Sequence, residues 1–304
     1  MSGIIASITV FKPDLDRLEK NITAILEQVS DVVLIINGKD FEEETLSLVS
    51  KINAPDKLHH ITNPGNSGVA TALNQAMQYA ADKGYDWVVT LDQDSVCPPD
   101  LVIQLSRHCS KERVGIIAPS FIDENYYRNV NSYTGWKFVM GAITSASLTN
   151  VAIWKEVGGF DDEFFIDYVD YEYCARLITK GYAVIVDYDV HFKHKIGDGK
   201  QVKLFNRFSF VVKNHSPFRK FYYVRNIRVF KKRYPKIAGA YFVKREMSAY
   251  VIGVIFFEKH KIKNLSAMIR GYFAANKMIK KDRIKAQKEL NQVREEIQSG
   301  EKQS

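Results

Sequence analysis

The sequence predicts an α/β protein built on a mostly parallel sheet. Three times in the first third of the chain, a short apolar segment is followed by apolar residues at helical spacing. Such alternation indicates parallel strands joined by crossover helices. The 304 residues, 46% of them hydrophobic, suffice for one core of this kind and an appended segment.

The first two strands are expected at residues 4–11 and 32–36, which are apolar and rich in β-branched side chains. The segment between them predicts a helix from its apolar residues Leu15, Leu18, Ile22, Ile25 and Leu26. Asn37 and Gly38 end the second strand, and a glutamate-rich helix follows.

A third strand is expected at residues 58–62 and leads into the turn-rich loop 63–68. The next helix is indicated by Ala72, Leu73, Ala76, Met77 and Ala80. Residues 183–187 predict a further strand in the second half of the chain.

Two aspartates, Asp92 and Asp94, follow another predicted strand at residues 87–91. In open α/β sheets, ligands bind at the carboxyl ends of the strands. Carboxylate oxygens suit Mg²⁺ or Mn²⁺, which readily share their coordination with substrate phosphates. The pattern is compatible with a cation that holds a diphosphate, but on its own it is weak, because two aspartates after a strand are more often turn or cap residues.

Four segments in a fixed order carry a resemblance to a known family: Thr9-Val10-Phe11, residues 66–74, Asp92-Gln93-Asp94, and Gly158-Gly159-Phe160-Asp161. Over about residues 4–233 the chain resembles the family 2 glycosyltransferases, and within them the bacterial rhamnosyltransferase-like branch. The resemblance implies the GT-A fold, a Rossmann-like, mostly parallel sheet flanked by helices. It also implies inverting transfer from a nucleotide-sugar donor with Mg²⁺ or Mn²⁺ as cofactor.

By this resemblance, Asp94 binds the metal, Asp92 shares the ion or contacts the ribose, and His194 is a further metal or diphosphate ligand. The residues expected to bind the nucleotide sugar are Thr9, Phe11, Asn37, Asn66, Gly68, Asn74, Asp92 and Gln93. Ser145 and Trp136 are expected on the acceptor side.

Asp170 matches the position of the family's catalytic base. An inverting transfer needs one base to take the proton of the acceptor hydroxyl. The family carries an adjacent acidic pair, whereas the neighbour here is Val169, so Glu172 and Asp167 remain alternative bases. Glu172 also stands four residues before Arg176, the spacing of a helical ion pair.

Two further positions depart from the family pattern. Ile36 stands where many relatives have aspartate, so the neighbouring Asn37 can still offer hydrogen bonds to the nucleoside but no charge. Ala146 stands where relatives tend to have glycine, and its methyl group would narrow the acceptor side. The preference for a nucleotide base therefore stays open.

Charge is distributed unevenly along the chain. Residues 201–304 hold 25 lysines and arginines against 7 acidic residues, a net charge of +18, whereas residues 1–200 carry −10. Aromatic and cationic residues alternate at 216–226, and an apolar cluster at 252–257 precedes three lysines within 259–263. This combination favours an anionic membrane surface over nucleic acid. The alternative is that the apolar residues pack on the catalytic domain or on a second subunit.

We divide the chain into a catalytic domain, residues 1–215, and a basic, mainly helical C-terminal region, residues 216–304. The nucleotide-sugar half is expected at about 1–95 and the acceptor half at about 96–215. The N-terminus shows no signal peptide, and the three cysteines lack metal-ligand spacing, which favours reduced thiols. We expect a cytoplasmic protein, peripheral at the inner face of a bacterial plasma membrane.

The expected function is metal-dependent, inverting transfer of rhamnose from dTDP-rhamnose to a lipid-linked glycan acceptor of a cell-surface polysaccharide. Donor and acceptor follow from the resemblance alone. The alternatives are a UDP-sugar-dependent hexosyl or galactofuranosyl transferase, a nucleotidyltransferase, and a non-catalytic glycan- or membrane-binding protein of the same fold.

Overall fold

The computed structural model describes residues 3–123, 133–194, 200–204, 208–212, 214–240 and 243–301. The chain forms two compact units, residues 1–199 and 200–304. The sequence-based division falls after residue 215, and the contacts divide the chain after residue 199. Each unit is described on its own.

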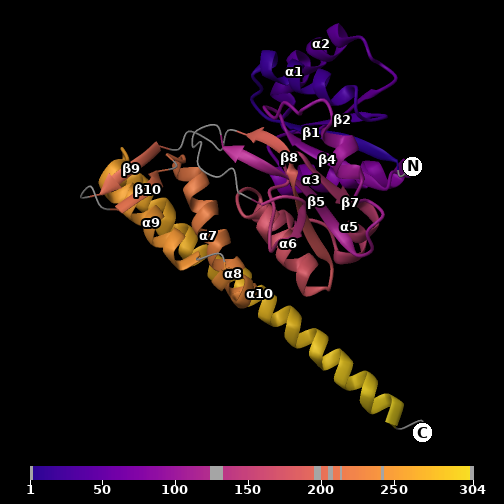
Figure 1. Ribbon diagram of the computed structural model, residues 1–304. Coiled ribbons are helices and arrows are strands. Elements are labelled where there is room, and N and C mark those ends of the chain that lie inside the picture. Colours follow the sequence, from indigo (N-terminus) through magenta and orange to yellow (C-terminus); the bar gives the residue numbers. More distant parts are fainter. Residues whose placement is uncertain are drawn as a thin grey trace. The chain divides into compact units, whose positions relative to one another are not determined.

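The first unit is built on an eight-stranded sheet in the order β3-β2-β1-β4-β7-β5-β8-β6, which confirms the α/β expectation (Figure 1). Its strands are β1 Ile4–Val10, β2 Val32–Ile36, β3 Leu58–Thr62, β4 Trp87–Asp92, β5 Val114–Asp123, β6 Trp136–Phe138, β7 Ser147–Asn150 and β8 Ala183–His194. Strands β1 to β4 pair in parallel, as does β5 with β8, while β7 and β6 run antiparallel to their neighbours.

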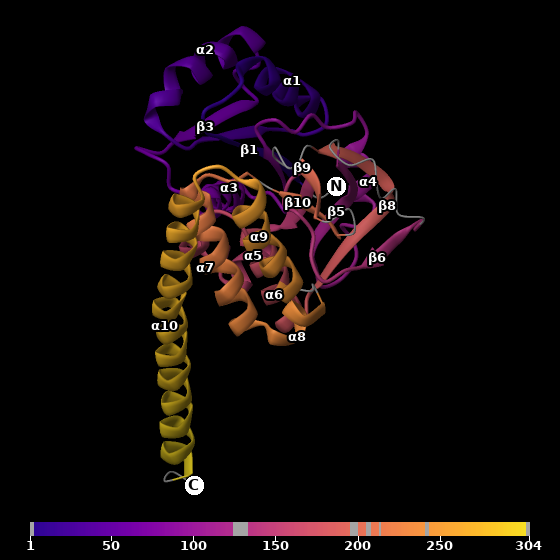
Figure 2. The ribbon, with the colours of Figure 1, turned by 90° about the vertical axis from the view of Figure 1, so that its left-hand side faces the viewer.

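Helices cover both faces of this sheet. The helices are α1 Leu15–Leu26, α2 Glu42–Ile52, α3 Val69–Asp82, α4 Leu101–Ser106, α5 Val151–Val157 and α6 Val169–Thr179, with 3₁₀ turns η1 Lys39–Phe41 and η2 Asp162–Phe164. Figures 1 and 2 show α1 and α2 on one face, and α3, α5 and α6 on the other. The central strands are buried on both faces, which explains why they read as continuous apolar runs.

The register of β1 brings the carboxyl ends of three strands together. Thr9 lies opposite Asp92 of β4, and Val10 lies opposite Ile36 of β2. The residues that follow these strands therefore meet at one edge of the sheet, where parallel sheets bind ligands. Strand β7, inserted antiparallel between β4 and β5, was not expected from the sequence.

Helix α3 is joined at its start to the segment that precedes α6. The Val69 amide donates a hydrogen bond to the Phe165 carbonyl at 2.6 Å. Gly68 has φ +87°, and a Cβ there would lie 2.7 Å from the same carbonyl oxygen. Only glycine fits this close approach of two backbone segments.

The second unit contains the hairpin β9 Lys200–Leu204 and β10 Phe208–Val212, followed by the helices α7 Pro217–Arg233, α8 Pro235–Ala240, α9 Val243–Phe257 and α10 Lys261–Glu301. The mainly helical C-terminal region is thus confirmed. Helix α10 packs on α7, where the Arg228 guanidinium lies 3.6 Å from the ring centroid of Tyr272. Residues 283–292 of α10 are exposed. None of the described helices is both long and apolar enough to cross a membrane.

We expect Gly68→Ala to lower the free energy of unfolding by roughly 2–4 kcal/mol, because alanine is strained at this φ and its methyl group meets the Phe165 carbonyl. Urea denaturation, with an unchanged dependence on urea concentration, measures the loss.

Gly65→Ala is the matched control in the same loop. An added Cβ at Gly65 meets no heavy atom of the described residues within 4 Å, so its effect is expected to stay within about 0.5 kcal/mol. Equal stability of the two variants would contradict the close approach at Gly68.

Candidate active site

The turn after β4 is held by polar side chains of α1. Asp92, the last residue of β4, has an exposed side chain, and that of Asp94 is partly buried. Asn21 donates to the Asp92 carbonyl at 2.7 Å, and Arg17 donates through Nε to the Asp94 carbonyl at 3.0 Å. Because these contacts use the backbone of the turn, they fix its shape without engaging the carboxylates. Asn21 and Arg17 were not identified from the sequence, since only the fold brings α1 to this turn.

Ser145 lies beneath the same turn. Its side chain is 4% exposed, its hydroxyl oxygen accepts from the Asp92 amide at 3.4 Å, and it lies 2.8 Å from the Ser95 hydroxyl. Ser145 therefore stabilises the backbone of the turn that carries the aspartates.

Gln93 connects the aspartate turn to the end of β1. Its side-chain oxygen accepts from the Phe11 amide at 2.7 Å, and its Nε2 donates to the Lys12 carbonyl at 3.4 Å. The Phe11 ring packs edge-on against Phe41, with centroids 5.4 Å apart. Together with Thr9, which lies opposite Asp92, these residues lie beside the aspartate turn at the carboxyl end of the sheet.

Asn37 is engaged in a buried polar network. Only 2% of its surface is exposed, and its oxygen accepts from Ser67 N at 2.9 Å, Ser67 Oγ at 2.7 Å and Asn63 Nδ2 at 3.2 Å. Its Nδ2 donates to the Gly68 carbonyl at 3.1 Å and to Asn66 Oδ1 at 3.2 Å. These bonds hold loop 63–68 against the end of β2.

Gln75 extends the network from α3, since it and Asn63 exchange hydrogen bonds of 2.9 and 2.7 Å. Asn63, Ser67 and Gln75 were not singled out from the sequence. The available signal was the cluster of turn-forming residues at 63–68, which marks a loop but does not reveal its partners.

Asn74 anchors the glycine-rich segment before α6. Its Nδ2 donates to the Phe160 carbonyl and to Asp162 Oδ1, each at 2.9 Å. Its oxygen accepts from Trp154 Nε1 at 3.0 Å and from the Phe160 amide at 2.7 Å. A Cβ at Gly159 would lie 2.8 Å from this oxygen, which explains the glycine. The four hydrogen bonds use the full capacity of the amide.

Three residues before α6 adopt left-handed backbone conformations. Phe165, Asp167 and Tyr168 have φ of 59°, 63° and 66°. Such conformations are costly for residues other than glycine and cluster at functional sites. They place Asp170 in the first turn of α6, where the Tyr171 amide donates to Asp170 Oδ1 at 2.9 Å.

Burial raises the pKa of the Asp170 carboxyl to about 7. This pKa of about 7 also includes the negative charges of Asp167 and Asp92, which raise it, and the hydrogen bond from Tyr171, which lowers it. The charge of Asp92, at the end of β4, thus acts on a carboxyl group in the first turn of α6. A carboxylate with a pKa near neutrality suits general-base chemistry.

Glu172 has a different environment. It is 2% exposed, and its carboxylate is held by Arg176 at 2.5 Å. Arg176 also reaches the Val157 and Gly158 carbonyls at 3.4 Å. The pair therefore links α6 to the end of α5.

Two other predicted site residues, Trp136 and His194, are not placed beside the aspartate turn by the described structure. Trp136 is on β6, the edge strand four positions from β4 in the sheet, where its ring lies 6.1 Å from His108 and 4.3 Å from Lys111 Nζ. The structure does not bring Trp136 to the aspartates. His194 ends β8, but its side chain and residues 195–199 lie outside the described part of the chain.

The acidic groups of the site fit a divalent cation. Among the described residues, no three His, Cys, Asp or Glu side chains gather into a ready-made metal site. Mg²⁺ and Mn²⁺ do not need one, because one or two carboxylates, substrate phosphates and water complete their coordination. A cation at Asp92 and Asp94 would also relieve the repulsion that Asp170 experiences.

Comparison with known proteins gives the family. The model of Glycosyl transferase family 2 matches residues 7–166. The chain is 32% identical over 242 residues to dTDP-rhamnosyl transferase RfbF of Shigella flexneri, an alignment that covers 74% of this chain and 78% of RfbF.

Solved structures share the fold at low sequence identity. The mannosyltransferase PcManGT from Pyrobaculum calidifontis, in complex with GDP-Man and Mn²⁺, has a TM-score of 0.58 and 14% identity, with 90% of this chain and 85% of that chain covered. S. aureus TarS 1-349, in complex with UDP-GlcNAc, has a TM-score of 0.59 and 11% identity, with coverages of 89% and 81%. The chain has the GT-A fold and belongs to glycosyl transferase family 2, in its rhamnosyltransferase-like branch.

Proposed function

We propose that this glycosyltransferase moves rhamnose from dTDP-rhamnose to an acceptor hydroxyl with inversion, using Mg²⁺ or Mn²⁺. The observation that carries the proposal is the buried Asp170 at the start of α6, whose pKa is raised to about 7 by burial and by the charges of Asp167 and Asp92. The similarity to RfbF supports the donor. The Mn²⁺ bound with GDP-Man in PcManGT supports the cofactor.

In this mechanism Asp170 takes the proton of the acceptor hydroxyl. The acceptor oxygen bonds to the anomeric carbon as the bond from that carbon to the diphosphate breaks. The Tyr171 amide holds Asp170 Oδ1 and so limits rotation of the carboxylate. A cation held by Asp94 and Asp92 would supply Lewis-acid neutralisation of the departing diphosphate. Because Arg176 already binds Glu172, we keep Asp170 as the base.

We propose that the donor contacts Thr9, Phe11 and Gln93 directly, since these residues lie beside Asp92. Four other predicted donor residues shape the site indirectly, because their polar groups already form hydrogen bonds that hold the neighbouring loops. These residues are Asn37, Asn66, Gly68 and Asn74. His194 remains a proposed further ligand.

The acceptor proposed here is a lipid-linked glycan at the inner face of a bacterial plasma membrane. The support is the net charge of +18 on residues 201–304, since clustered cations attract anionic lipid. Exposed apolar side chains on the same unit, including Phe256 and Ile262, would add an insertion component.

Asp94→Ala is expected to abolish the stabilisation that Mn²⁺ gives to dTDP binding and to remove transfer, because one of two carboxylate ligands is lost. Thermal shift with dTDP and UDP, each with and without Mn²⁺, measures this effect and compares the bases. Asp56→Asn, an exposed aspartate in the loop before β3, is the control. Wild-type donor binding and turnover that persist in excess EDTA would contradict the metal role.

Asp170→Asn is expected to retain dTDP and Mn²⁺ binding but to lose transfer by about 10²–10⁴-fold, the usual cost of removing a general base. Steady-state transfer with the donor held at saturation measures the loss. Glu163→Gln, an exposed acid just before α6, is the control. Normal turnover of Asp170→Asn together with inactive Glu172→Gln would move the base to Glu172.

The raised pKa of Asp170 predicts a pH-dependent gain in stability for Asp170→Asn. Below pH 3.8 the carboxyl is protonated in both the folded and the unfolded chain, so the two proteins match. From there to about pH 7 the unfolded chain ionises more readily, and wild-type stability falls relative to the variant.

Above pH 7 the variant should be more stable by a constant amount on the order of 1–3 kcal/mol. Metal-free urea denaturation across this pH range measures the difference. A variant that is less stable than wild type at pH 8 would show that Asp170 is held by favourable contacts instead.

A further inference from the structure

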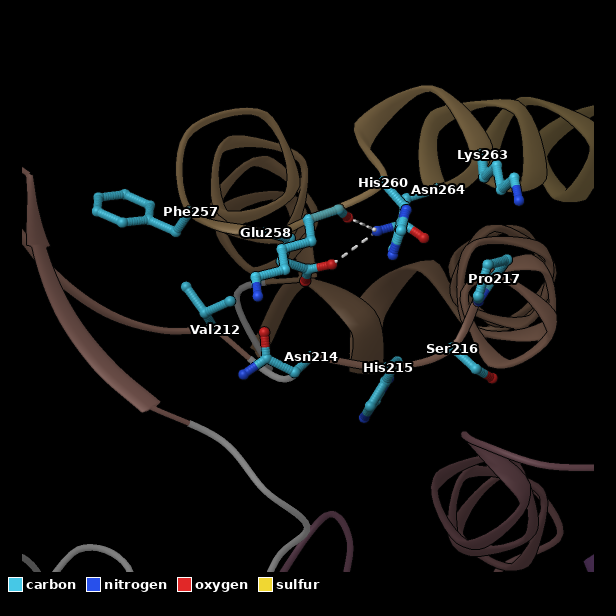
Figure 3. Close-up of a pocket in the computed structure, with 11 residues that line it drawn as sticks. Val212, Asn214, His215, Ser216, Pro217, Phe257, Glu258, His260, Lys263 and Asn264 are labelled. Carbon is cyan, nitrogen blue, oxygen red and sulfur yellow. Dashed lines mark hydrogen bonds between the residues drawn. The ribbon is translucent and has the colours of Figure 1, made fainter.

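The second unit contains a pocket of about 660 Å³ that the sugar transfer proposed above does not use. Its walls come from three places: the chain between β10 and α7, the end of α9, and the start of α10 (Figure 3). The lining residues are Val212, Asn214, His215, Ser216, Pro217, Phe257, Glu258, Lys259, His260, Lys263 and Asn264.

The lining carries a positive charge that its own carboxylate does not cancel. Lys259 and Lys263 are exposed, and both line the pocket. Glu258, the acidic residue of the described lining, is 7% exposed and already paired with Lys220 Nζ at 2.7 Å. Since Lys220 is fully buried, this ion pair is internal. The two exposed lysines therefore define the charge that a ligand meets.

Hydrogen bonds fix the geometry around these cations. Asn264 Nδ2 donates to Glu258 Oε2 and to the Lys259 carbonyl, each at 3.0 Å, and so binds α10 to the end of α9 (Figure 3). His215 Nδ1 lies 3.1 Å from the Tyr250 hydroxyl, which ties the opposite wall to α9. The lysines thus lie at a hydrogen-bonded connection between α9 and α10, which favours a defined site.

Large, exposed apolar side chains are adjacent in sequence to residues that line the pocket. Ile255 and Phe256, just before the lining residue Phe257, are 39% and 57% exposed, and Ile262, next to Lys263, is 85% exposed. Such residues beside a cationic pocket match a ligand that has an anionic head and apolar chains. A freely dissolved phosphate would make no use of them.

We propose that this pocket binds the phosphate headgroup of a membrane lipid. Lys259 and Lys263 contact the phosphate, while Ile255, Phe256 and Ile262 enter the boundary between headgroups and acyl chains. The site makes membrane attachment specific for exposed phosphate, beyond the general attraction of a basic surface. It is independent of donor chemistry in the first unit.

The test is sedimentation of the full-length protein with phosphatidylcholine vesicles that contain or lack phosphatidic acid. The double variant Lys259→Gln with Lys263→Gln is compared with Lys277→Gln with Lys280→Gln, which removes the same charge from exposed positions on α10 outside the pocket. We expect the pocket variant to lose roughly tenfold or more in affinity for phosphatidic acid vesicles, and the control to lose roughly threefold or less.

Circular dichroism and thermal shift with dTDP and Mn²⁺ accompany the assay. If both double variants stay folded and still bind dTDP with Mn²⁺, a loss of vesicle binding reports on the pocket alone and not on the proposed catalytic function. Equal losses by the two double variants would show diffuse attraction and overturn the pocket. Calorimetric binding of inorganic phosphate that depends on Lys259 and Lys263, without binding to vesicles, would assign the pocket to a free anion and overturn the lipid.

The apolar rim has its own variant. Ile262→Ser should weaken vesicle binding roughly threefold or more, whereas Ile284→Ser, an exposed isoleucine further along α10, should not change it. If neither variant weakens vesicle binding, Ile262 does not contact the lipid, and the proposal of a lipid ligand is overturned.

Discussion

The Asp170 carboxyl is buried at the start of α6, and the charges of Asp167 and of Asp92, at the end of β4, add to burial in raising its pKa to about 7. Much of the first unit serves to hold these carboxyl groups in place. The β1–β4 register fixes Asp92, and the side chains of α1 hold the turn that follows. The left-handed residues before α6 present Asp170. The pair Asp92 and Asp94 suits a cation whose coordination is completed by other ligands, and in a nucleotide-sugar enzyme the cation can arrive with the diphosphate.

The loops around these aspartates are held by buried amides. Asn37 and Asn63 link the end of β2 to the start of α3, and Asn74 links α3 to the segment before α6. Each amide lies between backbone segments that are distant in sequence. Removing one would leave its partners buried and unsatisfied, a larger cost than the net gain of a typical hydrogen bond. The polar network therefore defines how the loops after β2, before α3 and before α6 are held together.

The parallel strands and their helices could be predicted because their signals are local. Val32–Ile36 and Leu58–Thr62 have the bounds expected from their apolar runs, and the Asp92 turn follows its strand as expected. The role of Asn37 could not be predicted, since its hydrogen bonds reach residues about thirty positions away. Likewise, the antiparallel β7 and the pocket beside Lys259 depend on contacts that no local pattern encodes.

The central claim is that the cation, the diphosphate and the base share one site at the end of β4. The most direct measurement is anomalous diffraction from crystals grown with Mn²⁺ and dTDP-rhamnose. A single Mn²⁺ peak between the carboxylates of Asp92 and Asp94 and the diphosphate, with Asp170 on the opposite side of the sugar, is the predicted result. A bound donor whose diphosphate is held by protein side chains alone, with Mn²⁺ elsewhere, would contradict the account.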